Sequence, residues 1–103
     1  MACSLGSLPS DQLLSRLHTL IRRGNAVEAE LLAHLGEVDV RRLYLREAFP
    51  SMFAWCLGAL HFAEGVAYKR IAAARAARRH PELLEAVRQG DLHVTRVSLL
   101  ASL

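Results

Sequence analysis

Large aliphatic residues recur every three or four positions along the first half of the chain. This spacing predicts amphipathic helices, because residues three and four apart lie on the same helical face. Ser10 is suited to cap a first helix, and Gly24 is suited to end it. The apolar positions between them are Leu13, Leu14, Leu17, Leu20 and Ile21.

A second helix is predicted from Asn25 to about Glu47. Asn25 can cap it, and Glu28 stands three residues later, as in a capping box. Its apolar stripe comprises Leu31, Leu32, Leu35, Val38, Leu43 and Leu45. Such a stripe usually packs in a core, and binding of a partner is the alternative.

The middle of the chain predicts a short and very apolar helix. Phe49 precedes Pro50, and a residue before proline disfavours helical backbone. Ser51 can then cap a helix over residues 52–60. We expect this helix to lie at the centre of the core, with Trp55 packed there rather than exposed as a ligand-stacking residue.

The rest of the sequence predicts a turn followed by three more helices. The turn covers residues 61–63, and the helix after it covers residues 64–79. Pro81 and Gly90 are typical of the start and the end of the next helix. The last helix, capped near Thr95, stays apolar up to the final residue, so we expect this chain to be part of a longer protein.

Composition supports an all-α fold. The chain has 103 residues, of which 52% are hydrophobic, and Leu, Ala and Arg dominate. These residues have high helix propensity, whereas no alternating pattern predicts a strand. We expect a flexible leader over residues 1–9 and a single domain of five to six helices over residues 10–103.

The positive charge of the chain is concentrated in one predicted helix. Between Glu64 and Glu82 there are five basic residues and no acid, although the formal net charge of the whole chain is only +3. The excess of arginine over lysine can simply reflect a GC-rich genome, so the clustering is the stronger observation. It is typical of a nucleic-acid contact, and the alternatives are a solvated or intramolecular face and a protein partner.

The basic helix and the turn before it resemble a helix-turn-helix. The segment LHFAEGVAYKRI, from Leu60 to Ile71, is similar to the pattern L-G-L-S-x-x-A-x-R-R-L of bacterial regulators. His61 replaces the usual Gly and Ala63 the usual capping Ser. The pattern places Ala67 and Ile71, with Val66, against the core, and residues 64, 65, 68 and 69 outside. The predicted nucleic-acid contacts are Tyr68, Lys69, Arg70, Arg75, Arg78 and Arg79, of which the first two suit base edges and the last three suit phosphates.

A wider resemblance covers residues 43–100. The strings LYLREAFPSMFAWC, ALHFAEGVAYKRIAAARAARRHPELLEAV and GDLHVTRVSLLA resemble the helical region upstream of the nuclease motif in bacterial HNH endonuclease-type proteins, including the actinobacterial repeat family. This resemblance implies an accessory DNA-binding region that a metal-dependent nuclease domain normally follows. The segment PELLEAVRQGDLHVTRVSLLA is also similar to helix–Gly–helix units of partition-protein DNA-binding domains.

Catalytic and metal-binding motifs are missing from the sequence. A two-histidine metal site with a nearby asparagine is not supported by the scattered positions His18, His34, His61, His80 and His93. We therefore expect no metal, no cofactor and no nuclease activity of the chain's own. Cys3 and Cys56 form no paired motif, which is typical of a reducing bacterial cytoplasm. No signal peptide or membrane-spanning stretch is predicted.

These observations favour a DNA-binding helical domain, the accessory or targeting part of an HNH endonuclease-type protein. DNA is the expected partner, and no membrane is. The alternative is a helical scaffold or dimerisation module without a nucleic-acid role, which would use the second helix and the apolar stripe of the last one. In that case a homodimer or a missing C-terminal domain would cover these stripes.

Overall fold

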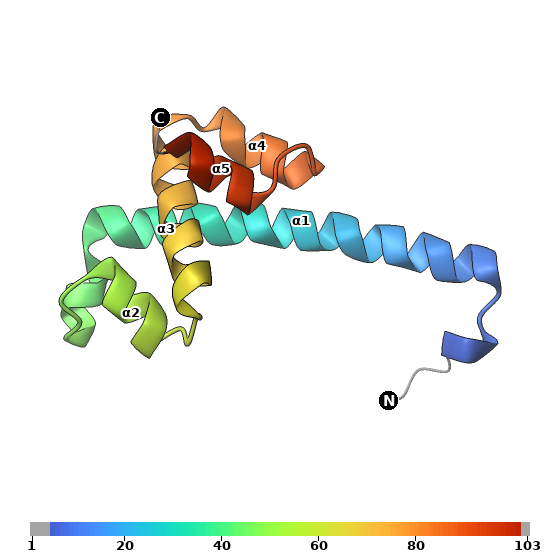
Figure 1. The fold of residues 1–103 in the computed structure, drawn as a ribbon, viewed down its shortest axis with the longest axis horizontal. Coiled ribbons are helices and arrows are strands. Elements are labelled where there is room, and N and C mark those ends of the chain that lie inside the picture. The colour runs from blue at the N-terminus through green and yellow to red at the C-terminus, as the bar shows by residue number, and fades with distance from the viewer. Residues whose placement is uncertain (1–4, 102–103) are drawn as a thin grey trace.

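The computed structural model describes residues 5–101, and every regular element in that range is helical (Figure 1). The predicted all-α class with five to six helices is therefore confirmed. Residues 1–4 of the predicted leader lie outside the described residues. In chain order the elements are the 3-10 turn η1 (Leu5–Ser7), α1 (Ser10–Arg41), the 3-10 helix η2 (Leu43–Glu47), α2 (Met52–Gly58), α3 (Glu64–Arg79), α4 (Glu82–Gln89) and α5 (Val94–Ala101).

The first two predicted helices are one continuous helix. α1 runs for 32 residues, so the predicted end at Gly24 and the predicted cap at Asn25 are wrong. Glycine inside a helix costs only about 1 kcal/mol relative to alanine, and a break there would leave helix-end carbonyls without partners. The Asn25 side chain instead lies against Gly90, at the end of α4. Ser10 begins α1, but no side chain caps this end.

α1 ends at Arg41, earlier than the predicted end at Glu47. Arg42 adopts a left-handed conformation with φ 53°, the 3-10 helix η2 follows, and Ala48 is again left-handed with φ 67°. The ring of Phe49 then packs so closely on Gly58 that a Cβ there would lie 2.5 Å from it. This irregular segment places α2 beside the C-terminal end of α1 (Figure 1).

The capped helix α2, the turn and α3 follow the prediction closely. Ser51 caps α2, since its Oγ accepts a hydrogen bond from the N–H of Ala54 at 3.0 Å. α2 ends at Gly58, and the N–H of Phe62 donates to the carbonyl of Cys56 at 3.0 Å. In the turn, His61 takes a left-handed conformation with φ 60°. α3 has the predicted bounds.

The last two helices, α4 and α5, are joined by a short connection over residues 90–93. Pro81 precedes α4, and Gly90 ends it with φ 83°, as predicted. The last helix begins at Val94, directly after His93, so Thr95 itself does not cap it and the helix starts slightly earlier than that residue. Thr95 lies inside the first turn of α5.

α3 is the central element of the folded body. It crosses α1 and packs against α1, α2 and α5 (Figure 1). Its buried surface consists of Ile71 and small residues, which permit close helix packing: Ala67, Ala73, Ala74, Ala76 and Ala77. The largest fully buried side chains elsewhere are Leu32, Cys56 and Val97. Trp55 is half-buried against this core, and its indole N–H donates to Glu47 at 2.8 Å.

The first half of α1 lies outside that body. The first buried residue of the helix is Ala29, and no residue from Ser10 to Gly24 is buried. In Figure 1 this half extends well beyond α3, α4 and α5, with η1 at its far end. We call residues 10–24 the arm.

Candidate nucleic-acid interface

The six predicted contact residues all lie on α3, but they do not share one face. At about 100° per residue, Tyr68, Arg75 and Arg79 fall on one side of the helix. Lys69 and Arg78 flank that side in opposite directions. Arg70 points to the opposite side of the helix, toward α1.

Tyr68, Arg75 and Arg79 line a groove of about 500 Å³ between α2 and α3. On the α2 side the groove is lined by Ser51 and Phe53 among others. Tyr68 is 68% exposed and Phe53 is 38% exposed, so both rings are accessible from solvent. This groove therefore brings together three of the six predicted contact residues.

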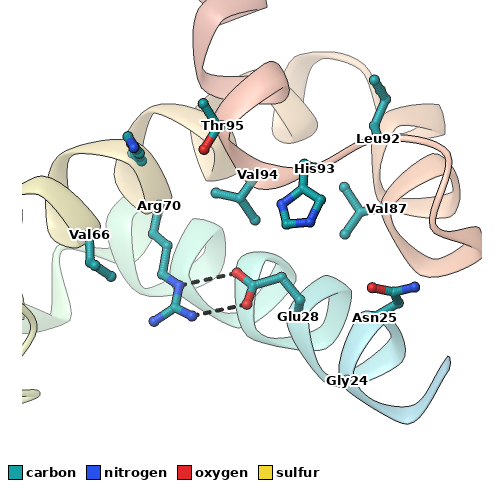
Figure 2. A pocket seen from close by; sticks show the side chains of 11 residues that line it. Gly24, Asn25, Glu28, Val66, Arg70, Val87, Leu92, His93, Val94 and Thr95 are labelled. Atoms are coloured by element: carbon teal, nitrogen blue, oxygen red, sulfur yellow. Dashed lines mark hydrogen bonds and ion pairs between the residues drawn. The ribbon is translucent and has the colours of Figure 1, made fainter. Parts of the chain in front are cut away.

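Arg70 is held inside the molecule. Its Nε and Nη2 donate to the two carboxylate oxygens of Glu28 at 3.1 and 2.9 Å (Figure 2). The guanidinium also lies 5.0 Å from the centre of the Phe62 ring, within cation–π range. Both side chains of the ion pair are largely shielded, at 27% and 23% exposed. Arg70 thus links α3 to α1 instead of facing a ligand.

Arg75 lines the groove but is also paired. Its Nε and Nη2 donate to Asp39 at 2.8 and 3.0 Å. Asp39 is 17% exposed, whereas Arg75 is 53% exposed. The hydrogen bond to Asp39 raises the pKa of Arg75. The guanidinium is therefore accessible, but a neighbouring carboxylate offsets its charge.

Arg78 forms a third link to α1. Its Nη1 donates to Glu37 at 2.6 Å, and Arg41 donates to the other oxygen of the same carboxylate at 2.8 Å. The hydrogen bond from Arg78, followed by the one from Arg41, lowers the pKa of Glu37 below the usual 4.5. Arg78 is 47% exposed, so its position is set by this pairing rather than by burial.

Lys69 and Arg79 differ from the other cations of α3. Both are exposed, and neither forms an ion pair with any residue in the described part of the chain. Lys69 directly follows Tyr68, and Arg79 lines the groove near the C-terminal end of α3. Together these two residues carry the positive charge of α3 that no carboxylate offsets.

Packing of the turn and of the start of α3 agrees with the sequence pattern in most respects. Ala67 is fully buried and Ile71 is 8% exposed, as predicted. Glu64 and Gly65 are exposed, also as predicted. Val66 was expected to hold α3 to the core, but it is 41% exposed and lies at the rim of a second pocket.

That second pocket has a volume of about 340 Å³ and lies on the other side of α3. Figure 2 shows it between α1, α3 and the segment that joins α4 to α5, with the Glu28–Arg70 pair on the Val66 side and His93 between Val94 and Val87. Its charged groups are partnered, apart from Lys69 at the rim.

Other chemistry is not apparent in the described residues. No group of three or more His, Cys, Asp or Glu side chains within residues 5–101 could hold a metal ion. Cys56 is fully buried, and burial raises the pKa of its thiol. Cys3 lies outside the described residues. None of the described helices has the length and apolarity to cross a bilayer.

Comparison with known proteins identifies no relative. No family model, no curated protein and no solved structure matches the chain significantly. The resemblance to the region upstream of an HNH motif stays a prediction.

Proposed function

We propose that α2, the turn and α3 form a helix-turn-helix unit through which the chain binds DNA. The observation that carries the proposal is the groove in which Tyr68, Arg75 and Arg79 lie together on the solvent side of α3. The turn supports it, because His61 has φ 60° at the position where the motif usually has glycine. Ala67 and Ile71 face the core at the positions where the motif requires apolar residues.

The proposed roles follow from position along α3. Tyr68 and Lys69 lie in the first part of the helix, which in this motif reaches base edges. Arg79 and Arg75 lie further along and suit phosphate oxygens. Arg70 and Arg78, which the sequence also suggested as contacts, serve instead to hold α3 on α1, because carboxylates of α1 bind them.

In a longer protein, such a unit would deliver an attached domain to DNA. The proposal keeps the inference that this chain is an accessory or targeting part of an HNH endonuclease-type protein, without nuclease activity of its own, in a bacterial cytoplasm. The alternative, a helical dimerisation module, is supported by a different surface, the apolar side of the arm.

Fluorescence polarisation with a labelled duplex tests the DNA proposal. We expect binding that weakens as salt rises from about 50 to about 200 mM, because cations on the protein displace counterions from DNA. Replacing Lys69 and Arg79 by Ala should lower affinity about tenfold at the lower salt and reduce the slope of log K against log salt by about 1, because Arg79 is the proposed phosphate contact of the two.

Arg88→Ala with Arg96→Ala is the matched control. It removes the same charge from α4 and α5, whose residues do not line the groove. We expect this control to bind much more tightly than the Lys69 and Arg79 variant. Equal losses in both double variants, or no binding at low salt, would contradict the proposal.

A further inference from the structure

The arm carries a contiguous apolar surface that faces solvent. Its large aliphatic side chains are each between 42% and 59% exposed: Leu13, Leu14, Leu17, Leu20 and Ile21. Contiguous exposed apolar surface usually marks an interaction site. In Figure 1 the arm extends beyond the folded body, so the body leaves room for a partner beside it.

The shape of this surface suits another helix. Leu13, Leu17 and Leu20 follow the spacing of four and three residues that forms the apolar seam of a helix pair. Together with Leu5 of η1 they line a groove of about 580 Å³, which we call the arm groove. A groove that runs along a helix and is lined by leucines at this spacing fits a rod-shaped partner.

The charged side chains that line the arm groove are of one sign. They are Arg16 and Arg23. They are seven residues apart, so both lie on the same edge of the seam, at positions that face a partner helix and select it by charge. Asp11, the only acid in the sequence of the arm, lies about 120–140° away from both around the helix. The arm groove is therefore apolar at its centre and basic along one edge.

These two arginines have no carboxylate partner in the described chain. Both are exposed, and within residues 5–101 neither forms a hydrogen bond or an ion pair through its side chain. Most arginines of α3 differ in this respect, because carboxylates of α1 bind them. A partner that brings carboxylates to this edge would match the arm groove in charge as well as in shape.

A second copy of the chain does not bring those carboxylates. In an antiparallel pair of arms, the basic edges would meet, so Arg16 and Arg23 of the two copies would face one another. In a parallel pair, they would face Leu14 and Ile21 on the other edge of the seam. Neither arrangement pairs a guanidinium with an acid, and juxtaposed like charges disfavour association.

A lipid surface also matches the arm less well than an acidic helix does. A helix that lies on an anionic membrane keeps its polar face rich in cations on both sides of the apolar face. On the arm, the side away from Arg16 and Arg23 carries Asp11 beside His18 and Arg22. The concentration of unpaired cations at one edge of a groove favours a helix with one acidic edge.

We propose that the arm groove binds an acidic amphipathic helix of another protein. Aliphatic side chains of that helix would pack against Leu13, Leu17 and Leu20, and its carboxylates would pair with Arg16 and Arg23. These arginines are about 10 Å apart along the helix axis, so acids on successive heptads of the partner would match them. The proposal uses none of the α3 groove, so it and the DNA proposal can fail independently.

Fluorescence polarisation with a labelled peptide tests the proposal on the full chain. The probe is a peptide of about three heptads with Leu in the seam and Glu at the flanking positions, and its matched counterpart has Lys in place of every Glu. At low salt we expect the Glu peptide to bind at least about tenfold more tightly than the Lys peptide, because only carboxylates complement the groove arginines. Added salt should reduce this preference.

Charge reversal in the arm groove should invert the preference. Arg16→Glu with Arg23→Glu should bind the Lys peptide more tightly than the Glu peptide. Arg46→Glu with Arg96→Glu is the matched control, because it changes the total charge equally and neither residue lines the arm groove. This control should still prefer the Glu peptide.

A change in the seam tests the apolar part of the contact. Leu17→Gln should weaken binding of the Glu peptide at least about tenfold, because it places a polar group in the centre of the seam. Val40→Gln, which changes an exposed apolar residue of α1 outside the arm groove, should bind as the unmodified chain does. Circular dichroism checks that the helices of both variants are intact.

Several results would overturn the proposal. Equal binding of the two peptides, or no binding of the Glu peptide at about 100 µM, would mean that the arm groove does not select an acidic helix. A doubling of the 11.4 kDa mass with concentration that Leu17→Gln abolishes would assign the arm groove to a second copy. Binding to phosphatidylglycerol vesicles that Leu17→Gln abolishes, without binding of the Glu peptide, would assign it to a lipid surface.

Discussion

Arg75 and Arg79 lie one helical turn apart on the same side of α3, yet their electrostatic surroundings differ. Asp39 binds Arg75 through two hydrogen bonds, whereas Arg79 has no ion pair with a described residue. A guanidinium that already binds a carboxylate must exchange that partner for a phosphate before it can contribute to DNA binding. In our account, Asp39 therefore weakens the contribution of Arg75.

Asp39→Asn should strengthen DNA binding. The change frees Arg75 to bind a phosphate, and the slope of log K against log salt should become steeper by about 0.9, the value for one added phosphate contact. Glu30→Gln is the control, because it removes one exposed carboxylate that does not line the groove. Affinity measured by polarisation should rise more for Asp39→Asn, and an equal rise in both variants would count against the role of Arg75.

The ion pairs of the individual arginines show which properties of α3 could be predicted from the sequence and which could not. The basic cluster was identified correctly, and so was the outward position of Tyr68 and Lys69. An intramolecular face was one of the alternatives, but its carboxylates were not predicted, because Glu28, Glu37 and Asp39 are distant from α3 in sequence, in the predicted helix over residues 25–47. The missed signal was the group of acids on the helix that packs against the basic one.

At the scale of elements, local sequence signals succeeded where a capping residue or a proline determines the backbone. Ser51 caps α2, and Gly90 ends α4 in a left-handed conformation. They failed at Gly24, because a glycine can also lie inside a helix when the rest of the helix is favourable. They failed again at Arg42 and Ala48, since non-glycine residues seldom adopt positive φ and nothing in the local sequence signals it at these two positions.

Two glycine substitutions test the continuity of α1 and the packing of α2. Gly24→Ala should stabilise the chain by up to about 1 kcal/mol and raise its helix content, because a Cβ there meets open space in a helix. Gly58→Ala should destabilise it by about 1 to 3 kcal/mol, because the new methyl group would overlap the ring of Phe49.

Urea denaturation followed by circular dichroism measures both changes. The two variants serve as controls for each other, since each adds one methyl group to a glycine in a helix. A loss of stability in Gly24→Ala would indicate that Gly24 ends a helix with a left-handed residue, as the sequence first suggested, and that α1 is broken there.

At the scale of the whole molecule, the arm gives the chain its elongated form, with principal extents of 50 × 31 × 20 Å. The sequence predicted the apolar stripe of the arm but not its exposure. Periodicity shows which side of a helix is apolar, but it does not show whether another element of the chain packs against that side.

We propose that the Tyr68 side of α3 contacts DNA. The most direct measurement is an NMR titration of the ¹⁵N-labelled chain with a DNA duplex. We expect amide shifts to concentrate on the exposed side of α3, around Tyr68, Lys69 and Arg79, and on the start of α2, while the arm and α4 change little. Shifts centred on the arm or on α4 and α5, with α3 unchanged, would contradict it.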